Sequence, residues 1–238
     1  MKRFTYLLAI LATAMFTGAA GAQSVGIHFC NGKAAQKLRP HDTAGSSAVA
    51  QSHWNNVTVK STDPNGHWNK GGLKRLVDNK GKTVKGMAVK VNSGPNQKAQ
   101  LWPADGVGWG FMGPNLTLQK GMVYAHPFIT VSGIPYAHYN VYVYADAGAN
   151  GGDGSATISV AGGANGAVSK NKTYYYHYAW ANGHFVRATA TSRGDADKTA
   201  TNYMVFKGNT AKAFTIDFNG TLGGGWTGVS GIQIVATK

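Results

Sequence analysis

The stretch "ITVSGIPYAHYNVYVYADAG" at residues 129–148 decides the fold class. In its second half, Val141 and Val143 alternate with Tyr142 and Tyr144, which is the side-chain period of a β-strand. Such a strand carries valines on one face and tyrosines on the other, and a strand that is apolar on both faces is typically central and covered twice. We therefore expect the valines in the core and the tyrosines beneath a covering loop. A tyrosine face that binds a ligand is the alternative.

Segments with the same alternation recur along the chain, separated by Gly, Asn, Asp and Pro. They lie at 24–29, 57–60, 86–91, 128–131, 139–145, 156–161, 173–180, 184–190, 203–208, 213–218 and 231–236. Many short strands joined by turns predict an all-β fold, specifically a two-sheet β-sandwich of the jelly-roll or galactose-binding-like kind. Short helical turns are expected only at 34–38 and 110–118.

The first 22 residues have the pattern of a signal peptide. Lys2 and Arg3 precede the apolar run at 4–16, and Ala20-Gly21-Ala22 fits the small-residue cleavage pattern. We expect cleavage before Gln23, one domain over 23–238, and a secreted, extracellular or periplasmic protein without a membrane span. A retained N-terminal anchor is the alternative.

The chain is strongly basic. It contains 23 Lys and Arg against nine acidic residues, a net charge of +14, and loss of Lys2 and Arg3 with the signal peptide would leave +12. All nine acidic residues are Asp. This charge favours acidic partners such as uronic or sulfated polysaccharides, while a solvated lysine surface is the simpler explanation. No nucleic-acid-binding motif accompanies the charge.

Five segments in order resemble a β-sandwich module of secreted bacterial proteins, common in planctomycetes and verrucomicrobia. They are "SVGIHF" (24–29), "DTAGSSAVAQSHWNN" (42–56), the 129–148 stretch, "NYMVFKG" (202–208) and "VSGIQIV" (229–235). The resemblance implies the sandwich fold over nearly the whole mature chain. It implies little about function, because the module accompanies both surface proteins and polysaccharide-degrading domains.

Loop aromatics are the candidate binding residues, because sugar rings stack their C–H faces on Trp and Tyr while polar neighbours bond the hydroxyls. They are Trp54 with Asn55, Trp68, Trp102 and Trp109. Each Trp also has a structural interpretation, as an aromatic plug at one end of the sandwich. On the predicted strand at 173–180, Tyr175 and His177 share a face and add a second candidate cluster.

A glycine-rich loop offers oxygen ligands for a metal. Asp146, Asn150 and Asp153 lie within "DAGANGGDG", and calcium prefers such ligands. A plain turn is the simpler interpretation, so no cofactor is expected apart from this candidate structural calcium.

The sequence predicts a non-catalytic, lectin-like protein that binds carbohydrate, with acidic polysaccharide favoured. One alternative is a polysaccharide-active enzyme of the lyase type, with a Tyr or His177 as base and Lys172 as the group that neutralises the uronate. Hydrolysis by two carboxylates is less favoured because Glu is absent. The other alternative is a structural surface or matrix protein that self-associates. Neither the glycan nor the oligomeric state follows from the sequence.

Overall fold

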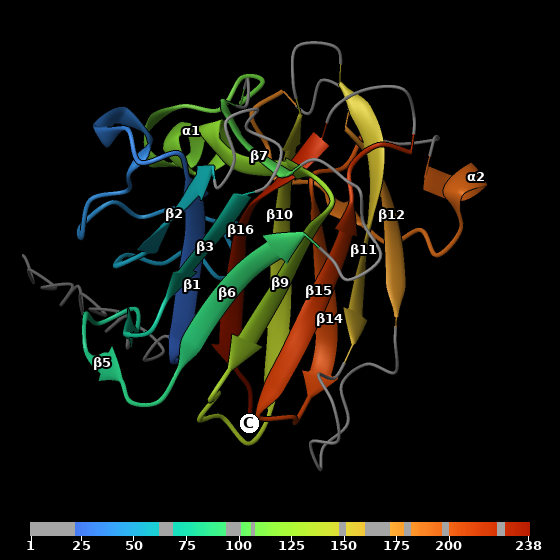
Figure 1. Ribbon diagram of the computed structural model, residues 1–238. Helices are drawn as coiled ribbons and strands as arrows, with labels where there is room; N and C mark the ends of the chain where they lie inside the picture. The colour runs from blue at the N-terminus through green and yellow to red at the C-terminus, as the bar shows by residue number, and fades with distance from the viewer. Residues whose placement is uncertain are drawn as a thin grey trace, which may run out of the picture.

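The computed structural model describes residues 22–61, 69–93, 101–105, 108–147, 151–159, 172–178, 182–196, 200–222 and 227–238. Most of them lie in β-strands (Figure 1). The strands are β1 (Ser24–Cys30), β2 (Asn55–Ser61), β3 (Asn69–Leu73), β4 (Leu76–Val77), β5 (Thr83–Val84), β6 (Ala88–Ser93), β7 (Leu101–Asp105), β8 (Gly121–Ala125), β9 (Pro127–Ser132), β10 (Tyr139–Ala147), β11 (Gly152–Ser159), β12 (Thr173–Tyr178), β13 (Arg187–Ala188), β14 (Tyr203–Asn209), β15 (Ala213–Asn219) and β16 (Thr227–Ala236). The helices are η1 (Ala34–Gln36), α1 (Gly113–Lys120) and α2 (Arg193–Ala196). The all-β class is confirmed.

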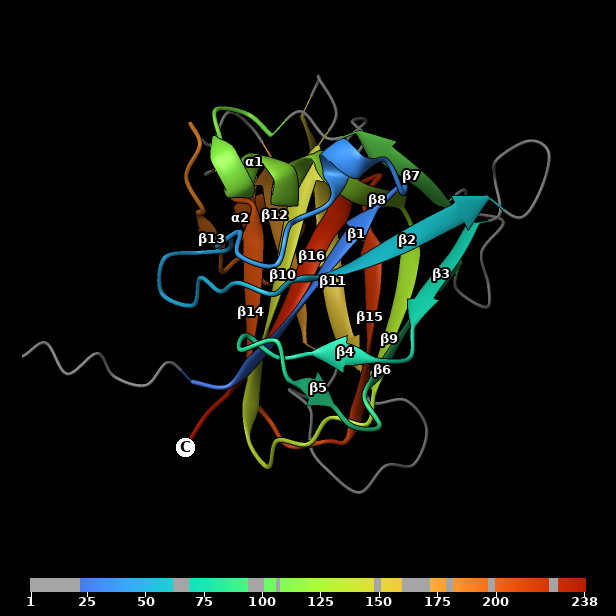
Figure 2. The ribbon, with the colours of Figure 1, turned by 90° about the vertical axis from the view of Figure 1, so that its left-hand side faces the viewer.

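The strands form one mixed 14-stranded sheet and a separate pair of β4 with β5. The main path runs β12-β11-β15-β9-β6-β3-β2-β1-β16-β10-β14-β13, with β8 branching from β16 and β7 from β8. The β1/β2 and β13/β14 pairs are parallel. This sheet curls into two facing layers, one with β6, β9 and β15 and the other with β10 and β14 (Figure 2).

β2 joins the two layers because it pairs with β1 along one half and with β3 along the other. At the opposite end of the path, β12 contacts the segment that leads from β13 to β14. The Tyr175 amide donates to the Ala190 carbonyl at 3.0 Å, and the Thr201 amide donates to the His177 carbonyl at 2.8 Å. The sheet is therefore nearly closed, and its pairing alone does not establish the two separate sheets that the sequence predicted.

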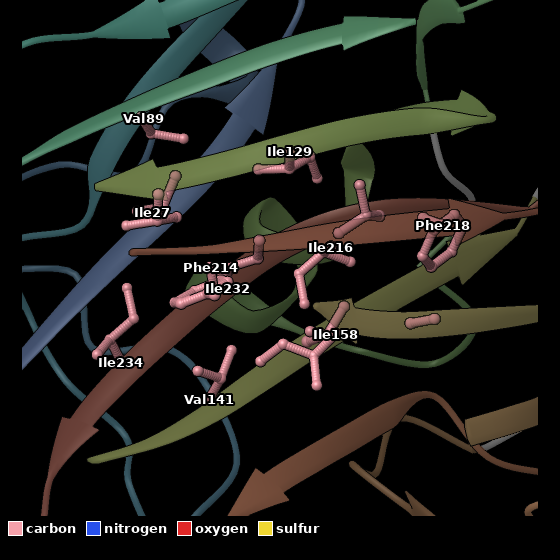
Figure 3. Close-up of a cluster of buried hydrophobic side chains, with 14 of the residues drawn as sticks. Ile27, Val89, Ile129, Val141, Ile158, Phe214, Ile216, Phe218, Ile232 and Ile234 are labelled. Carbon is pink, nitrogen blue, oxygen red and sulfur yellow. The ribbon is translucent and has the colours of Figure 1, made fainter. Parts of the chain in front are cut away.

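The main hydrophobic core fills the space between the layers (Figure 3). Ile232 and Ile234 of β16 and Val141 of β10 enter it from one side, and Ile129 and Ile216 enter it from the other. All five are fully buried. Burial of each such side chain contributes roughly 1.5–3 kcal/mol to folding, so the valine face of β10 belongs to the core, as predicted.

A second, smaller cluster covers the other face of β10. Tyr144 is fully buried there, and its ring packs edge-on against Trp54 at a centroid distance of 6.0 Å. Leu38 precedes the loop at 43–50, which we call the covering loop, and Leu118 belongs to α1. The tyrosine face therefore supports a loop and a helix, and Tyr142 near its edge is half-buried.

The predicted signal peptide, residues 1–22, lies outside the described residues except for Ala22. Among the helices of the described part, none combines the length and the apolar character that a membrane crossing requires.

Candidate functional site

A cavity of about 420 Å³ opens above the tyrosine face of β10. Four separate segments line it: the loop at 43–50, Asn115 of α1, the loop at 183–185 and Tyr203 of β14. These segments are brought together only by the curled sheet and by α1. We call this cavity the loop pocket.

One wall of the loop pocket is aromatic. Phe185 and Tyr203 meet edge-to-face, with centroids 6.2 Å apart and an interplanar angle of 89°. The ring centroid of Phe185 also lies 5.1 Å from that of Tyr144 and 4.7 Å from that of Phe111. Tyr203 stacks on Tyr142, with ring centroids 6.4 Å apart. Such contacts fix ring orientation, so the wall is a rigid apolar surface.

The lining also contains polar residues. Ser46 and Ser47 come from the covering loop, and Asn115 comes from α1. The Asn115 side-chain carbonyl accepts a hydrogen bond from the Gly45 amide at 3.0 Å, which fastens the loop to the helix. Ser47 is exposed and available to solvent or to a ligand.

Buried hydrogen bonds hold the covering loop against the sheet. The Tyr144 hydroxyl accepts from the Ser46 amide at 3.2 Å and donates to Gln233 Oε1 at 2.9 Å. Gln233 Nε2 donates to Gln51 Oε1 at 2.9 Å and to the carbonyl of Val49. Burial raises the pKa of the Tyr144 hydroxyl far above its usual range, so it stays a neutral donor. The loop is therefore ordered before any ligand arrives.

Asn202 positions the opposite loop. This fully buried side chain accepts from the Val186 amide at 2.8 Å and donates to the His184 carbonyl at 2.7 Å. The Gly183 amide donates to the Trp109 carbonyl at 2.9 Å. Together these bonds place Phe185 against the tyrosine face and leave His184 exposed at the rim.

Trp54 and Asn55 are structural, which corrects their assignment as ligand-binding residues. Trp54 is 4% exposed and its indole N–H donates to the Gln51 carbonyl at 2.9 Å. The Asn55 amide donates to the carbonyls of Gly26 and Val77 and accepts from the Val77 amide, each at 2.8 Å. Both side chains therefore use their polar groups internally, and their burial leaves no face for a sugar.

The other predicted tryptophans have different positions. Trp68 lies outside the described residues. Trp102 lies in β7 opposite Tyr124 of β8. Trp109 is partly buried against the main core, beside the loop that ends at Gly183. Trp109 is not itself among the described residues that line the loop pocket, although its carbonyl accepts the hydrogen bond from Gly183, which is one of them.

Tyr175 and His177 lie on the outward face of β12, as the alternation predicted, and both are half-buried. His177 Nδ1 bonds to the carboxylate of Asp153, its direct partner on β11. Tyr175 lines a small cavity of about 130 Å³ that also contains Arg187. These two residues form a site separate from the loop pocket.

The three predicted calcium ligands are not seen together. Asp146 is fully buried and Asp153 bonds to His177, while Asn150 lies outside the described residues. Within the described part of the chain, no group of three or more His, Cys or Asp side chains is placed to hold a metal ion. Calcium at this loop stays a prediction.

Sequence reasoning missed Phe185, Tyr203, His184 and Asn115 as one site. The strand predicted at 173–180 and the segment at 42–56 both contain candidate residues, but no sequence signal joins them to α1. Neither the protein-family models nor the curated proteins that we searched contain a match to this chain.

Proposed function

We propose that the protein is a lectin-like carbohydrate-binding protein whose binding site is the loop pocket. One observation carries the proposal: Phe185 and Tyr203 form a rigid aromatic part of a lining that also contains polar residues, in a pocket whose loops are already anchored by buried hydrogen bonds. Its volume of about 420 Å³ is typical of small-ligand sites.

The aromatic and polar parts of the lining match the two kinds of surface on a sugar. The C–H face of a pyranose ring packs on Phe185, while Ser47, His184 and Asn115 bond its hydroxyl groups. Because the loops are ordered before binding, association costs little conformational entropy, which favours affinity.

We further infer that the curled sheet is a variant of the β-sandwich and that the mature chain is exported after loss of residues 1–22. The pairing of the layers through β2 and the shared core between them support the first inference. The sequence pattern at 2–22 supports the second.

The test is a glycan-array screen with the mature protein at high salt, followed by calorimetry on the best ligand. Ser47→Trp inserts a bulky side chain at an exposed lining position and should abolish binding without unfolding the protein. Ser47→Ala is the matched control and should retain most of the affinity. If Ser47→Trp binds like the parent, the loop pocket is not the site.

Polysaccharide cleavage is a second candidate function, favoured by the His177 and Asp153 pair. A carboxylate on Nδ1 fixes the imidazole tautomer and leaves Nε2 as a base. Incubation with polyuronates, followed by ultraviolet detection of unsaturated products, tests it. His177→Gln should abolish any such turnover, and a parent protein without turnover removes this candidate.

A further inference from the structure

A second hollow lies on the outward face of β3 and β6. It has a volume of about 470 Å³, and its rim carries three lysines, Lys70, Lys74 and Lys90, all exposed. Gly71 and Gly72 form part of its floor. We call it the lysine groove. In Figure 2, β3 and β6 lie on the opposite side of the molecule from β13 and β14, so this groove is remote from the loop pocket.

The strand register extends the row of charges beyond the groove. Lys60 of β2 is the direct partner of Lys70 of β3. Lys90 of β6 is the direct partner of Gly72, two residues along β3 from Lys70. Diagonal neighbours of this kind are typically about 7–8 Å apart. Positive side chains therefore cross three adjacent strands at short, regular intervals.

This arrangement is unfavourable for stability alone. Like charges directly opposite on neighbouring strands destabilise a sheet, and Lys60 and Lys70 are such a pair. Among the described residues that line the groove, no Asp offsets the charge. A bound anion would relieve this repulsion.

The groove floor is open because the backbone packing requires glycine. A Cβ added to Gly72 would lie 2.8 Å from the Val89 carbonyl oxygen, closer than packed atoms allow. Consequently no side chain rises from β3 between Lys70 and Lys74, which lie on the same face of the strand as Gly72.

We propose that the lysine groove binds a linear polyuronate, an acidic polysaccharide whose carboxylates pair with Lys60, Lys70 and Lys90. Among the described residues that line the groove, none is Arg or aromatic, which favours this polymer over nucleic acid, because proteins hold nucleic acid with arginine and with stacked aromatic rings. The groove is independent of the loop pocket, so the proposal does not rest on the function proposed there.

The test measures binding of polygalacturonate to the full mature chain by calorimetry at physiological ionic strength. The triple variant Lys60→Gln, Lys70→Gln, Lys90→Gln should lose about tenfold or more in affinity, because three exposed ion pairs are removed. The salt dependence of binding should also become weaker. The matched control, Lys37→Gln, Lys120→Gln, Lys212→Gln, removes the same charge from exposed positions elsewhere and should change affinity by less than about twofold.

Equal losses in the two triple variants would overturn the proposal, because the attraction would then depend on net charge alone. Unchanged binding by the groove variant would also overturn it. Tighter binding of dextran sulfate or single-stranded DNA than of polygalacturonate would reject the uronate assignment. Ser47→Trp should bind polygalacturonate like the parent, so failure of the loop-pocket proposal and failure of this one give different results.

Discussion

Asp146 is a buried carboxyl group whose titration opposes folding at neutral pH. It is fully buried on β10, and its Oδ2 accepts a hydrogen bond from the Gly108 amide at 3.3 Å. Burial raises its pKa to about 7, while the Tyr178 hydroxyl nearby and the Ala147 and Gly108 amides lower it less. The folded protein therefore keeps this carboxyl protonated at pH values where the unfolded chain ionises it.

Asp146→Asn should remove this pH dependence. In the parent protein, the contribution is fully present below about pH 4 and is lost as the pH rises to about 7. The free energy of unfolding of the variant, relative to the parent, should rise across that range by up to about 4 kcal/mol. Urea unfolding at several pH values measures it. Parallel curves for the two proteins would contradict the assignment.

The contribution of His28 to stability has the opposite pH dependence. It is fully buried on β1, and its Nδ1–H donates to Asn56 Oδ1 at 3.0 Å. Burial lowers its pKa from 6.5 to about 4, while the bond to Asn56 and the carbonyls of Thr117 and Leu118 partly offset that effect. The neutral imidazole is thus the form that the fold accepts.

His28→Gln should reveal this effect at acidic pH. The parent's contribution is fully present above pH 6.5 and is lost as the pH falls to about 4, a loss of up to about 3 kcal/mol. Because Asp146 gains stability over the same interval, the parent's own curve should be nearly flat between pH 4 and 6.5. The variant should instead gain stability as the pH falls, and an unchanged curve would show that His28 does not titrate in this way.

At the scale of elements, the loops at 108–112 and 182–185 are held together by two glycines. Gly183 has φ +74°, and a Cβ there would lie 2.2 Å from the Gly110 carbonyl oxygen. Gly110 has φ +78° and faces Gly183 in return. This close approach seats the Phe185 ring, so the aromatic wall of the loop pocket depends on it.

Gly183→Ala should destabilise the protein and also weaken the proposed carbohydrate binding. Both the left-handed backbone and the clash oppose a side chain, at a combined cost on the order of 1–3 kcal/mol. Thermal unfolding and calorimetry measure the two effects. Gly194→Ala in α2 is the control, because no atom lies within 4 Å of an added Cβ. Equal effects of the two substitutions would show that the contact between Gly110 and Gly183 is unimportant.

The strands that sequence alone predicts best are those with uninterrupted alternation, such as β9, β10 and β15. β3 was missed because its "NKGGL" has paired glycines, and β7 because Pro103 interrupts it. The segment at 184–190 was predicted as a full strand but pairs only at Arg187–Ala188, since Asn202 and β12 take up its other backbone groups.

The loop pocket could not be predicted from the sequence, because its lining comes from separate parts of the chain. Asn115, Phe185 and Tyr203 are far apart in the chain and meet only through tertiary contacts. The sequence identified aromatic and polar residue types, and its candidates included Trp54, which packs in the cluster that covers the tyrosine face. Strand alternation depends on the local sequence, whereas a site assembled from four segments depends on the nearly closed sheet.

In the molecule as a whole, β16 is a central strand that joins three others. It pairs with β1, β10 and β8, and apart from the final Ala236 all of its residues are buried. A chain that ends at residue 226 should therefore remain unfolded, without the near-ultraviolet circular dichroism signal of packed aromatics. A chain that lacks only the exposed Lys238 should fold normally. A folded product from the shorter chain would show that β16 is dispensable.

The pairing of β1 with β16 has a consequence for biosynthesis. Ser24 is the partner of Val235, and the Ala236 amide donates to the Gln23 carbonyl at 2.9 Å. β1 cannot form this pairing until β16 has been synthesised, and contacts between residues so distant in sequence form slowly. During translation the nascent polypeptide consequently lacks its central strand until residues 227–236 have been synthesised. An unfolded polypeptide of this kind can still be threaded through a narrow translocation channel, which suits the export proposed for it.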